Sequence, residues 1–153
     1  MYRAAVLVHL LGVLLFFGNL SVAFALMLGA RRQSDPSVIG HSYRLLHRVD
    51  LWLTPVSVAL IFAGGVAAAR VAGITLLQPW VTRPLLLFGL SGAAFLLLVL
   101  PAQRKLVREG ATLLAGPNPE AYHRLRRRWL VSASVSTAMA LLAVALMVLT
   151  SPR

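Results

Sequence analysis

The 153-residue chain contains no cysteine and only four acidic residues, and these absences exclude several classes of site. Without cysteine there is no disulfide framework, no thiolate nucleophile and no cysteine-ligated zinc or iron–sulfur site. Charged residues make up only 12% of the chain, whereas hydrophobic residues make up 59%. An ordinary soluble domain is about one quarter charged. The composition therefore indicates an integral membrane protein.

Four long runs contain no Asp, Glu, Lys or Arg, and each is long enough for a helix that crosses a bilayer. They lie at residues 4–30, 51–69, 84–102 and 129–151. None alternates between apolar and polar positions, as a strand of a membrane barrel would. The sequence therefore predicts an all-α, integral membrane four-helix bundle that forms a single domain over residues 1–153. The first run is too long for the apolar region of a signal peptide, so we expect it to be retained.

The basic residues are divided unevenly between the two sides of the membrane. Most of the fifteen Lys and Arg lie in the first and third connections, at Arg31, Arg32, Arg44, Arg48, Arg104, Lys105, Arg108, Arg124, Arg126, Arg127 and Arg128. The other side carries Arg3, Arg70, Arg83 and Arg153. The positive-inside rule then predicts that both termini lie on the outer, periplasmic side of a bacterial inner membrane. The net charge of +11 therefore indicates topology and contact with anionic lipid rather than nucleic-acid binding.

The basic connections contain signals for helix boundaries. Asp35-Pro36 predicts the start of a helix that continues into the second span, with a kink near Thr54-Pro55. The segment 116–119, Gly-Pro-Asn-Pro, predicts a break before a short helix that leads into Trp129. We expect Trp129 to be an aromatic residue of the membrane interface.

Polar and small residues inside the spans are expected to face other helices. His9, Gly12, Phe16, Asn19 and Ala23 recur every three or four residues and therefore share one face of the first helix. A neighbouring helix can hydrogen-bond an amide and approach closely at a glycine, whereas lipid offers no polar partner. The same packing role is predicted for Gly64, Gly65, Gly89, Gly92, Ser132, Ser136 and Ala140.

His9 is the histidine placed clearly within an apolar span, and Met147 on the last span is expected at a similar depth. An imidazole and a thioether are candidate axial ligands for the iron of haem b, or a soft site for copper. Arg70 and Arg83 could then pair with haem propionates. The alternative is that His9 hydrogen-bonds a carbonyl or serine, that Met147 is apolar filling and that the arginines extend to the interface.

Asp50 and Gln103 are polar residues at the edges of spans. Asp50 stands beside Arg48 and three residues after His47, which favours an interfacial ion pair over a role in proton handling. No acidic residue lies well inside a span, and no nucleophile with a base is evident at one depth. The sequence therefore argues against a proton-coupled exporter or a hydrolase and leans against an enzyme.

The order of these residues resembles an uncharacterised bacterial family of four-helix integral membrane proteins, a domain of unknown function. The resemblance covers nearly the whole chain and rests on His9, Gly18, the segment 50–55 (Asp-Leu-Trp-Leu-Thr-Pro), Gly64 or Gly65, Trp80, Pro101, Gln103, Pro119, Tyr122, Trp129, the segment 146–148 and Pro152. The chain is also distantly similar to the copper-resistance protein D group and to the four-helix protoporphyrinogen oxidase. This similarity implies haem at an early histidine, which His9 matches. The oxidases also use a basic residue within a later helix, and residues 84–102 contain none.

Three hypotheses for function follow. In the first, a b-type haem held by His9, with Met147 or a histidine of another subunit as second ligand, transfers electrons near the outer face. In the second, the chain is a non-catalytic accessory subunit of a larger respiratory or transport complex. In the third, His9 and Met147 handle copper. The expected partners are the lipid bilayer and either other membrane subunits or a second copy in a homodimer, and no nucleic acid.

Overall fold

The structure is a computed structural model that describes residues 1–31, 35–117 and 119–151. Within these ranges the chain is helical, with short turns and no strand. The elements are α1 (Tyr2–Arg31), α2 (Pro36–Val71), α3 (Pro79–Ala94), the π-helical η1 (Phe95–Val99), α4 (Leu100–Ala115) and α5 (Pro119–Leu149). Because α3, η1 and α4 are continuous, four helices are long and apolar enough to cross a membrane. The predicted all-α four-helix fold is confirmed. Arg32, Asn118, Pro152 and Arg153 lie outside the described residues.

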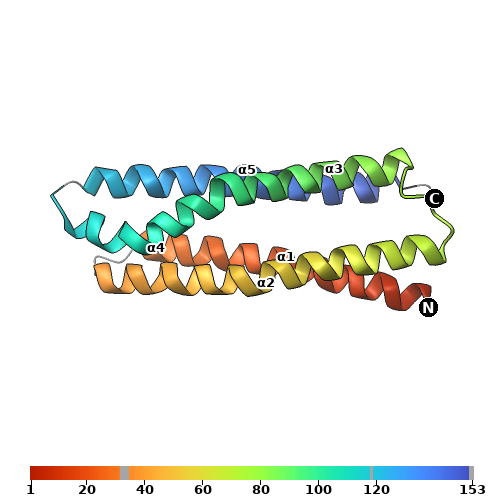
Figure 1. The fold of residues 1–153 in the computed structure, drawn as a ribbon, viewed down its shortest axis with the longest axis horizontal. Helices are drawn as coiled ribbons and strands as arrows, with labels where there is room; N and C mark the ends of the chain where they lie inside the picture. The colour runs from red at the N-terminus through yellow and green to blue at the C-terminus, as the bar shows by residue number, and fades with distance from the viewer. Residues whose placement is uncertain (32–34, 118, 152–153) are drawn as a thin grey trace.

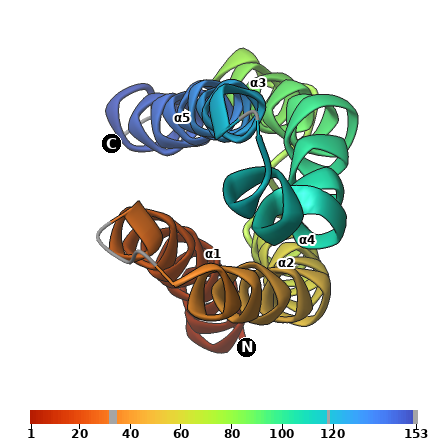
Figure 2. The ribbon, with the colours of Figure 1, turned by 90° about the vertical axis from the view of Figure 1, so that its left-hand side faces the viewer.

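The four long helices form two antiparallel pairs that lie side by side (Figure 1). One pair is α1 packed along α2, and the other is α3 packed along α5. α4 joins the pairs because it contacts both α2 and α5. In end view the helices form an open arc, with α4 on the closed side and α1 and α5 at its two ends (Figure 2). Both chain termini lie at one end of the bundle, the terminal end; the opposite end, where α1 leads to α2 and α4 leads to α5, is the basic end.

The helices extend beyond the predicted spans at the basic end. α2 begins at Pro36 and α5 at Pro119, which confirms that the connections are partly helical. Asp35 caps α2, because its carboxylate accepts a hydrogen bond from the Ser37 N–H at 2.8 Å. The third helix continues well past Gln103, beyond the apolar run at residues 84–102. With 36 residues, α2 is about 54 Å long, whereas a bilayer core is about 30 Å thick. α2 is therefore longer than a bilayer core is thick, and its turns before residue 51 lie outside the predicted span.

A single π-helical turn changes the packing partner of the third helix. The Leu100 N–H bonds to the carbonyl of Phe95, five residues earlier, and Pro101 follows immediately. A proline has no N–H to donate and its ring crowds the preceding turn, so an inserted residue relieves the helix at this point. Before this turn α3 packs on α5, and after it α4 crosses toward α2 (Figure 1). This crossing brings Gln103 to the centre of the bundle.

The main buried cluster occupies the basic half of the bundle and is shared by α1, α2, η1, α4 and α5. Met27, Tyr43 and Trp129 are each at most 2% exposed within it. The hydroxyl oxygens of Tyr43 and Tyr122 are 2.6 Å apart, and the Trp129 ring packs edge to face on Phe24. Trp129 therefore belongs to the core, and the prediction that it serves as an interfacial aromatic is wrong.

α1 and α2 approach each other closely along the predicted stripe. Gly12, Asn19 and Ala23 are buried, so the expectation that this face of α1 packs on protein is confirmed. A Cβ atom added to Gly12 would lie 2.7 Å from a backbone nitrogen of α2. A Cβ atom added to Gly64 would overlap the backbone nitrogen of His9. These two glycines allow backbone-to-backbone contact, as small residues commonly do in membrane helices.

α3 and α5 are joined by a reciprocal pair of serine hydrogen bonds. The Ser91 hydroxyl donates to the Ser136 carbonyl at 2.7 Å, and the Ser136 hydroxyl donates to the Ser91 carbonyl at 3.0 Å. Ala140 is fully buried on the same face of α5. Gly89 and Gly92, in contrast, have open space beside them, so the prediction that they pack on another helix of this chain is wrong.

The two pairs meet through aromatic rings in the terminal half, which is the half that holds His9, Gly64 and Met147. The centre of the Phe88 ring on α3 lies 5.4 Å from that of Phe16 on α1 and 6.1 Å from that of Phe62 on α2. Contact between the pairs is therefore looser here than in the basic half, where α1, α2, η1, α4 and α5 share one core.

Candidate functional site

His9 lies on α1 against the glycine pair of α2. Its Nδ1 is 2.8 Å from the carbonyl oxygen of Ile61, so a neutral imidazole donates from Nδ1 and keeps its lone pair on Nε2. A Cβ atom on Gly65 would lie only 3.1 Å from Nδ1, which shows that the ring packs directly on this glycine. The hydrogen bond to a carbonyl that the sequence left open is thus present. It is also the arrangement that orients most metal-ligating histidines.

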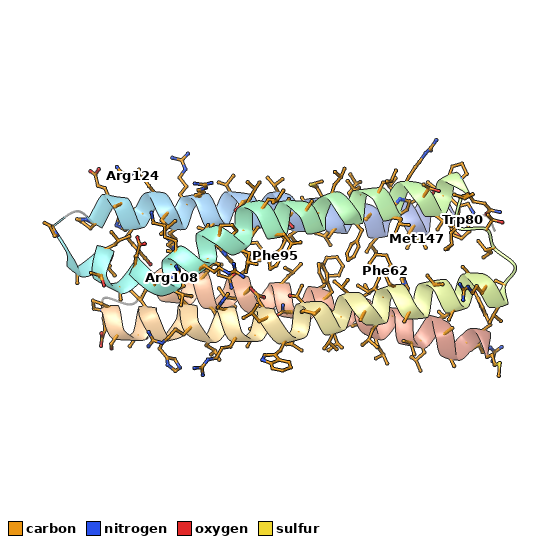
Figure 3. The ribbon with its side chains drawn as sticks, in the orientation of Figure 1. Phe62, Trp80, Phe95, Arg108, Arg124 and Met147 are labelled. Atoms are coloured by element: carbon orange, nitrogen blue, oxygen red, sulfur yellow. The ribbon has the colours of Figure 1, made fainter. Side chains whose placement is uncertain are left out.

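The other residues predicted for a haem site lie toward the terminal end, but among the described contacts none touches His9. Met147 is half-buried on α5 and lies between the two helix pairs (Figure 3). Arg70, in the last turn of α2, and Arg83, near the start of α3, are exposed and belong to no salt bridge within the described ranges. The structure therefore gathers these residues at one end of the bundle without assembling them into a finished site.

Asn19, Asp50 and Gln103 meet in one buried cluster between α1, α2 and α4. Asn19 Nδ2 donates to Asp50 Oδ1 at 2.9 Å and to Thr54 Oγ1 at 3.0 Å. Gln103 Nε2 donates to Asp50 Oδ2 at 2.8 Å. The exposed fractions of the three residues are 4%, 5% and 0% respectively. Three helices therefore converge on a single buried carboxylate.

Asp50 is not the interfacial ion pair that the sequence favoured. The salt bridges among the described residues are Lys105–Glu109 on α4 and Arg124–Glu120 on α5. Each joins two exposed residues of the same helix, four positions apart. A buried carboxylate without a cation is costly, and the two amide donors offset only part of that cost. The prediction failed because sequence spacing identifies only neighbours on the same helix, such as His47 and Arg48. Gln103, which donates to Asp50 in the structure, is 53 positions further along the chain.

The cluster leaves buried polar atoms without partners. Asn19 Oδ1, Gln103 Oε1 and His47 Nδ1 accept or donate no hydrogen bond among the described residues. Most buried polar atoms in proteins are paired. Because both amide NH₂ groups face the carboxylate, both amide oxygens must point away from it. The arrangement therefore suits a charged carboxylate at the cost of two unpaired acceptors.

Thr54 is the member of the cluster that sequence reasoning missed, since it was considered only as part of a kink. Its hydroxyl oxygen accepts the second hydrogen bond of Asn19 Nδ2. The signal was available, because Thr54 follows Asp50 by four residues and so lies on the same helix face.

Comparisons with known proteins agree with the fold. Residues 4–151 match the family described as predicted integral membrane protein (DUF2269). Searches of the curated proteins and of the solved structures gave no significant match. The family match covers nearly the whole chain and includes all four apolar helices. The chain therefore belongs to the DUF2269 family of integral membrane proteins.

Proposed function

We propose that this membrane protein binds b-type haem through His9 in the terminal half of the bundle and transfers electrons near the outer face of a bacterial inner membrane. The hydrogen bond between His9 Nδ1 and the Ile61 carbonyl at 2.8 Å carries the proposal. It fixes the tautomer in which Nε2 is the basic nitrogen, and it orients the ring. Haem would supply one-electron redox chemistry at this position.

The surroundings of His9 support this proposal. The two helix pairs meet here through the rings of Phe16, Phe62 and Phe88 rather than through a large shared core. Met147 lies between the pairs and offers a thioether as the second axial ligand (Figure 3). A histidine of a second copy is the alternative second ligand.

Two arginines at the terminal end would bind the haem propionates. Arg70 and Arg83 are exposed and belong to no salt bridge among the described residues. Their guanidinium groups match the planar geometry of carboxylates and would hold the haem propionates near the membrane surface.

The test is an absorbance spectrum of the full chain, oxidised and dithionite-reduced, purified in mild detergent from cells supplied with a haem precursor. We expect a Soret band that shifts on reduction, that is lost in His9→Ala and that persists in His123→Ala, which changes an exposed histidine. Met147→Ala should alter the reduced spectrum if the thioether is a ligand. A flat spectrum from folded, helical protein contradicts the proposal. Metal analysis of the same sample separates iron from copper, which the same two donors would suit.

A second candidate is a non-catalytic accessory subunit of a larger membrane complex. The observation that favours it is the open space beside Gly89 and Gly92 on α3, where another helix could approach closely. This candidate predicts co-purification with a larger partner, without any cofactor. Gly89→Leu should abolish that association, whereas Gly18→Leu, at an open position on α1, should preserve it.

A further inference from the structure

We propose that Asp50 is a proton-binding site and that His47 passes the proton between Asp50 and the basic end of the bundle. The inference does not depend on haem. It rests on a buried carboxylate held by two neutral amides, on two unpaired amide oxygens beside it, and on a half-buried histidine one turn closer to the basic end.

The Asp50 carboxylate has no fixed cation beside it within the described residues. The charged and titratable groups on the turns that adjoin it are His47 and Arg48 on α2 and Arg104 and Lys105 on α4, and α1 contributes none within two turns of Asn19. On α5, the half-buried cation is Arg126. Of these, His47 and Arg126 are half-buried and the others are exposed. Arg126 donates to the backbone carbonyl of Met27 instead. Neutralisation by a proton is therefore the available way to remove a buried charge.

The geometry suits a proton better than a metal cation. Gln103 Nε2 lies 2.8 Å from Asp50 Oδ2, which is also the usual length of an O–H···O hydrogen bond. If the Gln103 amide rotates by about 180°, its unpaired Oε1 takes the position of Nε2. A protonated Asp50 Oδ2 then donates to Gln103 Oε1, and the distance between the two heavy atoms stays the same. A hard divalent cation such as Ca²⁺ instead needs about six or more oxygen ligands at about 2.4 Å. Here NH₂ groups face both carboxylate oxygens.

Gln103 is the amide that rotates, because the Asn19 amide makes two hydrogen bonds. Asn19 Nδ2 donates to Thr54 Oγ1 as well as to Asp50 Oδ1, so its rotation would break a second hydrogen bond. The Gln103 amide has one such bond in the structure. Asn19 therefore remains a donor to Oδ1 in both protonation states, while Gln103 changes from donor to acceptor.

The proposed transfer moves one proton between two side chains, His47 and Asp50. His47 and Asp50 are three residues apart on α2 and share one face of the helix. A proton leaves the His47 imidazolium and binds Asp50 Oδ2, which leaves a neutral imidazole and a neutral carboxylic acid. His47 then takes up another proton from water at the basic end, and the reverse sequence returns the proton.

Protonation also changes how the two helix pairs are joined. Asp50 ties α1 and α4 to α2, and α4 is the element that connects one pair to the other. Hydrogen bonds to a charged carboxylate are roughly twice as strong as neutral ones. A proton on Asp50 therefore weakens the link between the pairs.

Infrared difference spectroscopy of the full chain in lipid vesicles, recorded as the pH is changed, tests the site. We expect a carboxylic acid C=O stretch that is lost in Asp50→Asn and kept in Asp35→Asn, where the exposed carboxyl at the start of α2 is replaced. The band should respond to pH and not to exchange of Na⁺ for K⁺. A response to the alkali cation instead of pH overturns the proposal.

Gln103→Met is a second test that retains the Asp50 carboxyl, so the proposal can still be tested if Asp50→Asn does not fold. In this variant the Asp50 band should move to the frequency of a carboxyl without an acceptor. An unshifted band in Gln103→Met, or no band assignable to Asp50 at any pH at which the helices persist, overturns the proposal.

The relay is tested by the rate at which the Asp50 band appears after a pH jump. His47→Gln should slow this rate by about tenfold or more without changing the final amplitude, because a positioned proton donor has been removed. His41→Gln, at an exposed position on α2, serves as the control and should leave the rate unchanged. Equal rates in His47→Gln and His41→Gln contradict the role of His47.

Discussion

The basic and terminal halves of this bundle are held together in different ways. In the basic half, α1, α2, η1, α4 and α5 share one core around Tyr43 and Trp129, and three helices converge on Asp50. In the terminal half, each pair packs on itself and the pairs meet through a few aromatic rings. Burial in lipid does not itself drive helices together, so close packing and polar contacts decide which surfaces stay joined. One end therefore fixes the pairs, whereas at the other end the described contact between the pairs is made by these aromatic rings.

The largest effect expected from a single change is in the shared core. Trp129→Ala should destabilise the protein by about 3–5 kcal/mol, because it removes a large side chain that is 2% exposed and leaves a cavity. Phe62→Ala is the matched change in the terminal half, where the ring is 41% exposed, and should cost clearly less. Thermal unfolding in detergent, followed by circular dichroism, measures both. Equal losses would remove the distinction between the halves.

The second prediction concerns the contact within the α1/α2 pair. Gly64→Ala should cost about 1–3 kcal/mol, because the new methyl group overlaps the backbone of α1 at His9 and forces the helices apart. Gly18→Ala places the same methyl group in open space on α1 and should not destabilise the protein. Chemical denaturation of both variants provides the comparison. Unchanged stability in Gly64→Ala would show that the helices are not in backbone contact.

These features differ in how far the sequence could predict them. The long runs without charge predicted the four helices, and the spacing of Gly12, Asn19 and Ala23 predicted the buried face of α1, because both signals are local along one chain segment. The partner of Asp50 was not predictable in this way. Gln103 reaches Asp50 only after a π-helical turn redirects the third helix, and no local periodicity encodes that turn. Gly89 was wrongly predicted to pack on another helix of the chain, because a small residue in a span does not by itself indicate a helix contact.

A smaller effect is expected from the serine pair that joins α3 to α5. Ser91→Ala removes the hydroxyl that donates to the Ser136 carbonyl and should cost about 0.6 kcal/mol, the average for such bonds in membrane proteins. Ser134→Ala, at an exposed position on α5, is the control. Denaturation curves recorded in the same detergent give the difference. A loss above about 2 kcal/mol would exceed the largest values measured for such bonds and would indicate that the serines do more than link two helices.

The smallest effect concerns the start of α2 and depends on pH. Hydrogen bonds from the Ser37 side chain and backbone N–H hold the pKa of Asp35 below its ordinary value. Because the folded-state pKa is lowered, the cap contributes fully above the ordinary pKa, and this contribution is lost as the pH falls through the folded-state value. Asp35→Asn keeps a capping side chain but should lose that dependence on acid. Unfolding temperatures measured from neutral to acidic pH would contradict this if both proteins lost stability equally.

The most direct test of the difference between the halves is a distance measurement by paired spin labels. The chain has no native cysteine, so labels can be attached at Leu28 with Arg127 near the basic end and at Leu7 with Val148 near the terminal end; all four positions are exposed. Without a bound cofactor, we predict a narrow distance distribution between α1 and α5 at the basic end and a broad one at the terminal end. If haem binds between the pairs as proposed, it should narrow the second distribution only. Equally narrow distributions at both ends of the cofactor-free protein would contradict the account.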